Sequence, residues 1–146
     1  MAKHISNMNQ LQEALMPTMV KMVDELAERV YETLNYFLQE YYNSYDPKSY
    51  RRQYDLLRSA VKVEPKIKGN KVTASVYIDT ESMDNYYNAT GIQVARWANQ
   101  GTHGGLKTGG NTPRVWDDTM KEIVDNGELL KLAIQYLRSK GISVRV

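Results

Sequence analysis

The sequence predicts an α+β fold with a long N-terminal helix, a small antiparallel β-sheet made of a hairpin, and C-terminal helices packed on the sheet. Three observations carry this prediction. Apolar residues recur at gaps of three and four through the first third, two alternating runs flank Gly69 and Asn70, and helical spacing returns in the last third. A chain of 146 residues without internal repeats predicts a single domain over 1–146.

The first helix has a broad apolar face that runs to about Tyr41. Pro17 lies inside this pattern, and because proline fits best in a first helical turn we expect the helix to begin near Pro17. Residues 1–10 would then be flexible. Pro47 biases Asp46 toward extended geometry, so the helix should end near Ser44. The residues of the apolar face are Leu11, Leu15, Met19, Met22, Leu26, Val30, Leu34, Phe37 and Tyr41.

A hairpin is predicted from period-two alternation over 60–68 and 71–79. Val61, Val63 and Ile67 alternate with polar residues in the first run, and the second run alternates likewise, which is typical of a sheet with one wet face. Gly69 with Asn70 supplies the turn. Pro65 indicates an edge position or a bulge.

The next helix is expected over 91–99 and should stop at Gly101. The segment 101–111 is rich in glycine and small polar residues, so we expect a mobile loop. Residues 50–59 permit either a short helix or a loop.

Two further helices are predicted near the C-terminus. Thr112 is a candidate cap before Pro113, and Asp117 with Asp118 suits the positive end of the helix that follows. Asn126 and Gly127 should interrupt the pattern. A last helix over 129–137 should be closed by Gly141, and 142–146 could add a terminal strand.

Composition favours an intracellular protein without a dedicated phosphate-binding role. Nineteen Lys and Arg against seventeen Asp and Glu leave a formal charge of +2, and cysteine is absent. The N-terminus lacks the apolar core of a secretory signal, and no apolar run approaches the roughly 18 to 20 residues that span a bilayer. We therefore expect no membrane insertion. Eleven Tyr and two Trp beside one Phe supply ring surface that suits subunit contacts.

No catalytic, metal or cofactor site is expected. The two histidines, His4 and His103, lack partners at metal-ligand spacing. The glycine-rich segment places Lys107 and Thr108 before its last glycines, whereas a Walker sequence requires them after the closing glycine. Helix electrostatics accounts for Asp117 and Asp118. An enzyme acting through His103 is the least favoured function.

The segment 45–58 is the most distinctive part of the chain because it interleaves rings and guanidinium groups beside a proline. Three interpretations stay open: a subunit interface, ordinary local packing, or stacking and phosphate contacts in a small nucleic-acid-binding module. Asp46, Asp55 and Glu64 dilute its positive charge, which weighs against nucleic acid. The residues that would contact nucleic acid are Tyr50, Arg51, Arg52, Tyr54, Arg58 and Lys107.

Several short motifs follow one another in a recognisable order. A long helix leads into Tyr-x-Pro-x-x-Tyr-x-Arg over 45–52, then Leu56 with Leu57, the hairpin, Ala-Arg-Trp-Ala-Asn-Gln-Gly-Thr over 95–102, and Pro113 before a helix. This order resembles the head-tail joining or tail-completion proteins of long-tailed bacteriophages and prophages. Gln53 replaces the threonine usual in that family, and Asn99 stands where the family has an acidic residue.

The resemblance implies a non-enzymatic structural virion protein that forms a ring at the neck, around the channel for double-stranded DNA. Its partners would be copies of itself, the head connector and tail-tube or tail-terminator proteins. DNA would pass through without sequence-specific contacts. The protein would be assembled in the host bacterial cytoplasm and reside in the virion. The candidate subunit-interface residues are Tyr45, Pro47, Tyr50, Arg52, Tyr54, Gly101 and Thr102.

Overall fold

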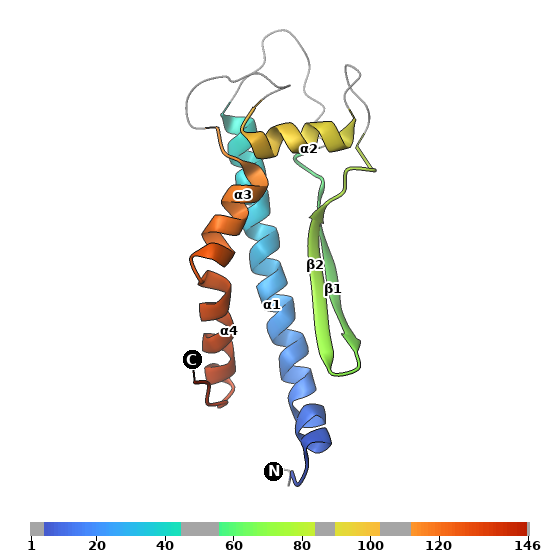
Figure 1. The fold of residues 1–146 in the computed structure, drawn as a ribbon, viewed down its shortest axis with the longest axis vertical. Helices are drawn as coiled ribbons and strands as arrows, with labels where there is room; N and C mark the ends of the chain where they lie inside the picture. The colour runs from blue at the N-terminus through green and yellow to red at the C-terminus, as the bar shows by residue number, and fades with distance from the viewer. Residues whose placement is uncertain (1–4, 45–55, 84–89, 103–111, 146) are drawn as a thin grey trace.

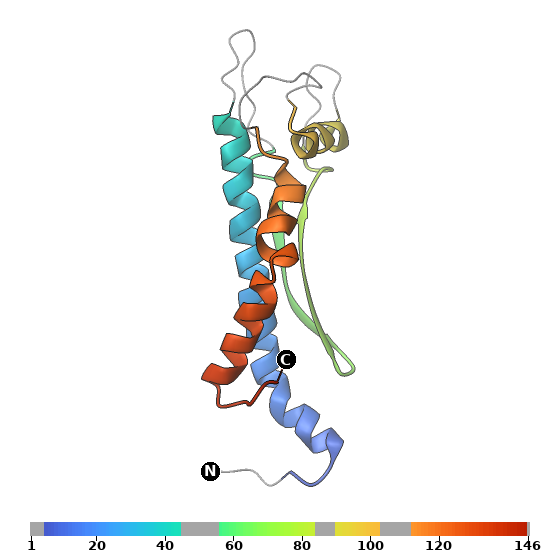
Figure 2. The same ribbon diagram turned by 60° about the vertical axis from the view of Figure 1, so that its left-hand side comes forward.

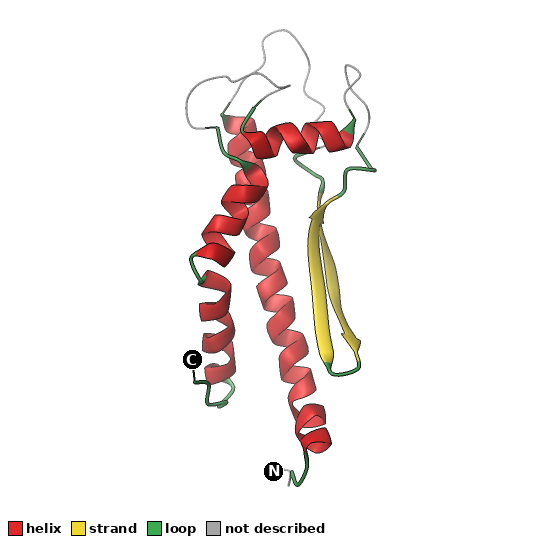
Figure 3. Ribbon diagram, in the orientation of Figure 1, coloured by secondary structure: helices red, strands yellow, loops and turns green. Residues whose placement is uncertain are grey.

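The computed structural model describes residues 5–44, 56–83, 90–102 and 112–145, and its α+β architecture confirms the predicted fold class (Figure 1). One long helix, α1 (Met8–Asn43), lies in the middle. The hairpin lies on one side of α1 and the C-terminal helices lie on the other, while α2 crosses the end where α1 finishes (Figures 1 and 3). The C-terminal helices pack mainly against α1, and not on the sheet as the sequence suggested.

Helix α1 begins at Met8, so the predicted start near Pro17 is wrong. Asn7 caps the helix through its side chain, and Pro17 lies inside it. Proline removes the hydrogen bond to the carbonyl of Glu13, but both residues are exposed, so water can replace the lost donor. The first turns lean away from the rest of the helix in Figure 2, as expected near an internal proline. The C-cap is Ser44, which confirms the predicted end.

The hairpin consists of β1 (Ala60–Lys68) and β2 (Lys71–Ile78), joined by Gly69 and Asn70 as predicted. The strands pair antiparallel, with a shift of register between Val63 and Lys66. This irregularity confirms the bulge expected at Pro65, which cannot donate to the ladder. Gly69 has φ of +62°, a value that glycine adopts without strain in tight hairpin turns.

The buried core gathers at the C-terminal end of α1. Leu34 and Leu38 are completely buried there, and the cluster also takes one or two residues from each neighbouring segment. These partners come from the turn before β1, from β1 itself, from the turn after β2, from α2 and from α3. The other members are Tyr41, Leu56, Ala60, Met83, Ala98 and Val115.

Helix α2 (Gly91–Gln100) starts with a capping box between Thr90 and Gln93 and ends at Gly101, as predicted. Gly91 is required by close packing, because a Cβ atom there would lie 2.1 Å from the carbonyl oxygen of Thr80. Gly101 adopts φ of +71°, the left-handed conformation common after a helix.

Helix α3 (Val115–Met120) starts later than expected, so the predicted cap at Thr112 is wrong. Arg114 occupies the cap position, and its N–H donates to the Asp118 carboxylate at 2.9 Å. The backbone of Thr112 instead passes close to Gly101, where α2 ends. Asp117 and Asp118 do lie in the first turn of the helix, as helix electrostatics predicts.

A π-helical turn, η1 (Lys121–Asp125), continues α3 and ends before Gly127, which confirms the predicted interruption. Helix α4 (Glu128–Ser139) then runs alongside α1. Gly141 closes α4 as predicted, because its N–H and that of Ile142 donate to the carbonyls of Arg138 and Leu137. These bonds turn the chain back onto α4, and the terminal strand expected from Ile142 onward is not found over 142–145.

Candidate contact surfaces

Five of the seven sequence-predicted interface residues lie outside the described residues: Tyr45, Pro47, Tyr50, Arg52 and Tyr54. The residues that flank this segment are described. The hydroxyl of Tyr42, at the end of α1, accepts a hydrogen bond from the N–H of Leu57 at 3.3 Å. The two ends of the segment 45–55 are therefore held together at the end of α1.

Gly101 and Thr102 lie where the end of α2 meets the end of α1 within one chain. The N–H of Thr102 donates to the carbonyl of Trp97 at 3.0 Å, and the carbonyl of Thr102 accepts a hydrogen bond from the Tyr41 hydroxyl. Thr102 is only 8% exposed. The structure thus gives Thr102 a role in joining α1 to the end of α2 and Gly101 a role in ending α2, and their predicted role in a subunit interface stays a prediction.

The side chain of Asn99 forms two hydrogen bonds to Asp117 that the sequence did not predict. Its side-chain oxygen accepts the N–H of Asp117 at 2.8 Å, and its amide nitrogen donates to the Asp117 carboxylate at 3.2 Å. An Asn side chain can supply both a donor and an acceptor, whereas an ionised carboxylate supplies acceptors only. Asn99 is therefore suited to tying α2 to the first turn of α3.

The groups that the sequence analysis weighed for catalysis are not brought together in the described ranges. His4, His103 and Lys107 lie outside them. Within the described ranges, no cluster of three or more His, Cys, Asp or Glu side chains could hold a metal ion.

The hairpin is tied to α1 by Lys62. Its ammonium group lies 2.7 Å from the Asp24 carboxylate and 3.0 Å from the Glu28 carboxylate. The hydrogen bonds to Asp24 and then to Glu28 raise the pKa of Lys62 above its ordinary value. Lys62 therefore stays charged at neutral pH and fixes one face of the hairpin against the middle of α1.

Beyond Lys62 the hairpin extends into the open. Ile67 pairs with Val72 near the turn, yet it is 56% exposed, because α1 does not cover this part of the ribbon. The hairpin turn stands clear of α1 in both views (Figures 1 and 2). We call this part the lysine tip, because its strands carry three exposed lysines beside Ile67, on the opposite face of the ribbon: Lys66, Lys68 and Lys71.

On the other side of α1, a groove separates α1 from α4. It measures about 470 Å³ and has apolar side chains of both helices in its walls. No residue of α4 is fully buried, although this helix has a clear apolar face. The apolar lining residues are Met22, Leu26, Leu132 and Tyr136.

The α1 side of this groove is acidic. Glu25, Glu28 and Glu32 line it, together with Arg29. Glu28 also pairs with Lys62, but within the described part of the chain Glu25 and Glu32 have no ion-pair partner. We call this hollow the acidic groove, since its carboxylates outnumber its single guanidinium group.

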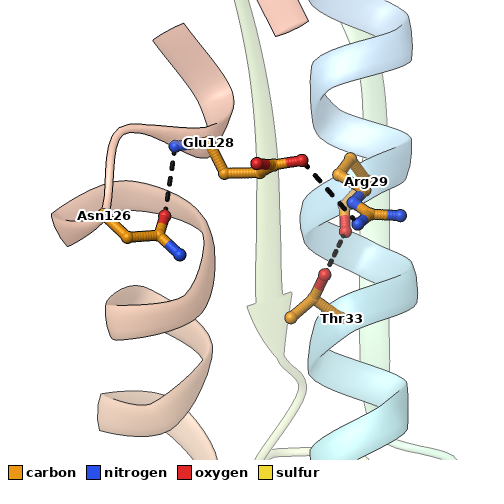
Figure 4. Close-up of polar contacts among 4 residues, drawn as sticks. All are labelled: Arg29, Thr33, Asn126 and Glu128. Carbon is orange, nitrogen blue, oxygen red and sulfur yellow. Dashed lines mark hydrogen bonds and ion pairs between the residues drawn. The ribbon is translucent and has the colours of Figure 1, made fainter. Parts of the chain in front are cut away.

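One weak ion pair links the start of α4 to α1 beside the acidic groove. Figure 4 shows the Glu128 carboxylate at the start of α4 reaching toward Arg29 of α1, at 4.0 Å. Asn126 accepts the N–H of Glu128 at 3.1 Å, and Thr33 donates to the carbonyl of Arg29 at 2.8 Å. Because both charged groups are partly exposed, the pair contributes little to stability. Since this ion pair adds little, the contact between α4 and α1 depends mainly on half-buried apolar side chains of the two helices.

The fold and these surfaces define an α+β protein built around one helix with two unlike, half-covered flanks. The chain belongs to the YomN family, whose model matches residues 7–139. This family carries the name of a phage-derived prophage protein, so the chain is phage-associated, as the resemblance implied. No curated protein and no solved structure matches the chain. In the described ranges, no helix is both long enough and apolar enough to cross a bilayer.

Proposed function

We propose that this protein is a structural component of the virion of a tailed phage, where it joins the head connector to the tail as a neck or tail-completion protein. The proposal is supported by membership of a phage-associated family and by the motif order over 45–113. It assigns a non-enzymatic role. The partners are the connector and tail-tube or tail-terminator proteins, and assembly takes place in the host cytoplasm.

The observation that carries the proposal is the pair of unlike flanks on opposite sides of α1. One flank is a hairpin whose lysine tip projects into solvent, and the other is an acidic groove under a loosely held helix. A ring of identical copies uses head-to-tail interfaces, in which one surface of each copy meets a different surface of the next. A chain with two unlike contact surfaces on opposite sides suits such a ring.

The charge balance supports a place beside a DNA channel. A formal charge of +2 is too small to hold DNA through many phosphate contacts, since each neutralised phosphate adds affinity. A neck ring must let double-stranded DNA pass without retaining it. We infer that DNA passes through the ring without sequence-specific contacts.

Deletion of the gene from the phage or prophage that encodes it tests the proposal. Electron microscopy of the lysate should show filled heads and complete tails that are separate or come apart during purification. The matched control is the same deletion supplied with the intact gene from a plasmid, which should restore joined particles. Normal infectious virions from the deletion would remove the proposed function.

A further inference from the structure

We propose that the lysine tip of one copy docks into the acidic groove of a second copy of this chain. The inference rests on the proposed function, because it names the contact through which the ring would form. Its two halves are Lys66, Ile67, Lys68 and Lys71 on the hairpin, and the groove between α1 and α4.

Charge complementarity identifies the occupant of the groove. The tip presents three exposed lysines, whereas the α1 wall of the groove presents Glu25 and Glu32 without ion-pair partners among the described residues. Opposite charges brought together at an interface steer association and set the register of docking. A second copy brings its lysines to every groove in a fixed ratio of one to one, as a closed ring requires.

Apolar chemistry complements the charges. Ile67 is 56% exposed at the tip, and the groove offers the half-buried side chains of Leu26, Leu132 and Tyr136. An aliphatic side chain that enters such a groove is removed from water together with the walls that it covers. The tip therefore presents an apolar face and a basic face, and the groove offers both apolar and acidic side chains.

The geometry requires two molecules. The hairpin and α4 lie on opposite sides of α1, so a tip cannot reach the groove of its own chain (Figure 1). Both the tip and the C-terminal end of α4 lie toward the end of the molecule that carries the N-terminus (Figures 1 and 2). Copies arranged side by side around a common axis can therefore bring one tip to the next groove.

Strand addition along the hairpin is a less suitable contact. Among the described residues the sheet has two strands, and an open strand edge is a template for pairing with another chain. Here β1 carries Pro65 at a bulge, with Lys66 and Lys68 beyond it. Proline, bulges and lysines are the features that protect natural edges from such pairing, so the tip is the better site of contact.

Disulfide trapping tests the contact directly, because the natural chain has no cysteine. A chain carrying both Ile67→Cys and Gln135→Cys should give a ladder of linked copies under mild oxidation, since Gln135 lines the groove. Mixing the two single-cysteine chains should give only a dimer that contains one of each. The matched control pairs Ile67→Cys with Tyr36→Cys, an exposed position outside the groove lining, and should give no ladder.

A charge exchange tests the chemistry of the contact. Glu25→Lys with Glu32→Lys should weaken self-association by about tenfold or more, as measured by light scattering or sedimentation over a concentration series. Adding Lys66→Glu with Lys68→Glu to the same chain should restore it. Circular dichroism and thermal unfolding of each variant show whether the monomer fold is retained.

The outcomes separate the contact from the function. No ladder at the highest protein concentration reached, or an Ile67→Cys homodimer in place of the mixed dimer, would overturn the docking contact. If the deletion phage still yields separate heads and tails, the neck function stands without this contact. A ladder together with normal virions from the deletion would keep the contact and overturn the function.

Discussion

The two ends of α1 differ in how they are used. At the C-terminal end, Leu34, Leu38 and Tyr41 are buried under residues from the hairpin and its flanking turns, from α2 and from α3. Before Thr33, only Met22 and Ala27 of α1 are buried, and the hairpin and α4 flank this part of the helix without covering it fully. One end of α1 therefore holds the fold together, while the other leaves apolar and charged surface exposed.

Truncating one side chain at each end of α1 tests most strongly whether the two ends differ in their contribution to stability. Leu38→Ala should lower the free energy of unfolding by about 2 to 5 kcal/mol, because a completely buried side chain leaves a cavity. Leu26→Ala, at the half-buried groove, should cost about 1 kcal/mol. Chemical denaturation followed by circular dichroism measures both. Equal losses would contradict the division into a packed end and an open end.

Gly91 tests how tightly the packed end is built. Gly91→Ala should destabilise the fold by about 1 to 3 kcal/mol or more, because the added Cβ would meet the Thr80 carbonyl, which is backbone and must shift. Gly127→Ala is the control. It has φ of +79° with no atom within 4 Å, so it should cost only the roughly 1 to 2 kcal/mol of a left-handed residue. A larger loss at Gly127 would show that the close approach at Gly91 is not limiting.

Tyr41 tests the hydrogen bond that joins α1 to the end of α2. Tyr41→Phe keeps the ring but removes the donor to the buried carbonyl of Thr102, so about 1 to 3 kcal/mol should be lost. Tyr36→Phe is the matched control, because Tyr36 is 58% exposed and should tolerate the change. Thermal unfolding of the pair would reveal a similar Tm for both if the Tyr41 bond contributed nothing.

The smallest effect is expected at the lysine tip. Lys66→Ser with Lys68→Ser should change the free energy of unfolding by no more than about 0.5 kcal/mol, because both side chains are exposed. Urea denaturation of the monomer gives this value. A marked loss of monomer stability would mean that the tip supports the fold itself, and the contrast between the two ends would then fail.

Local pattern was enough to predict most of the elements. Alternation around Gly69 and Asn70 gave the hairpin, and Gly101, Gly127 and Gly141 marked places where helices end or break. The errors have causes that the local sequence pattern does not contain. Pro17 was expected to start α1, but at an exposed position the lost hydrogen bond can go to water. Thr112 looked like a cap, yet its backbone packs near Gly101, eleven residues earlier in the chain.

The candidate surfaces were harder to predict than the elements. The acidic groove combines Glu25 and Glu32 with Leu132 and Tyr136, residues about a hundred positions apart, and no local spacing encodes their meeting. Nothing in the spacing of the charged residues of α1 indicated which of them face α4. In contrast, the exposed lysines near the turn follow directly from the hairpin register, once the strands are placed.

The hydrogen bond between Tyr42 and Leu57 has a consequence for how such proteins can diversify. It joins the end of α1 to the turn before β1, on either side of residues 45–55. Doubling the length of a closed stretch adds only about 0.6 kcal/mol of entropic cost. The number of residues between Tyr42 and Leu57 can therefore change in evolution at little entropic cost, while the rest of the molecule is inherited unchanged.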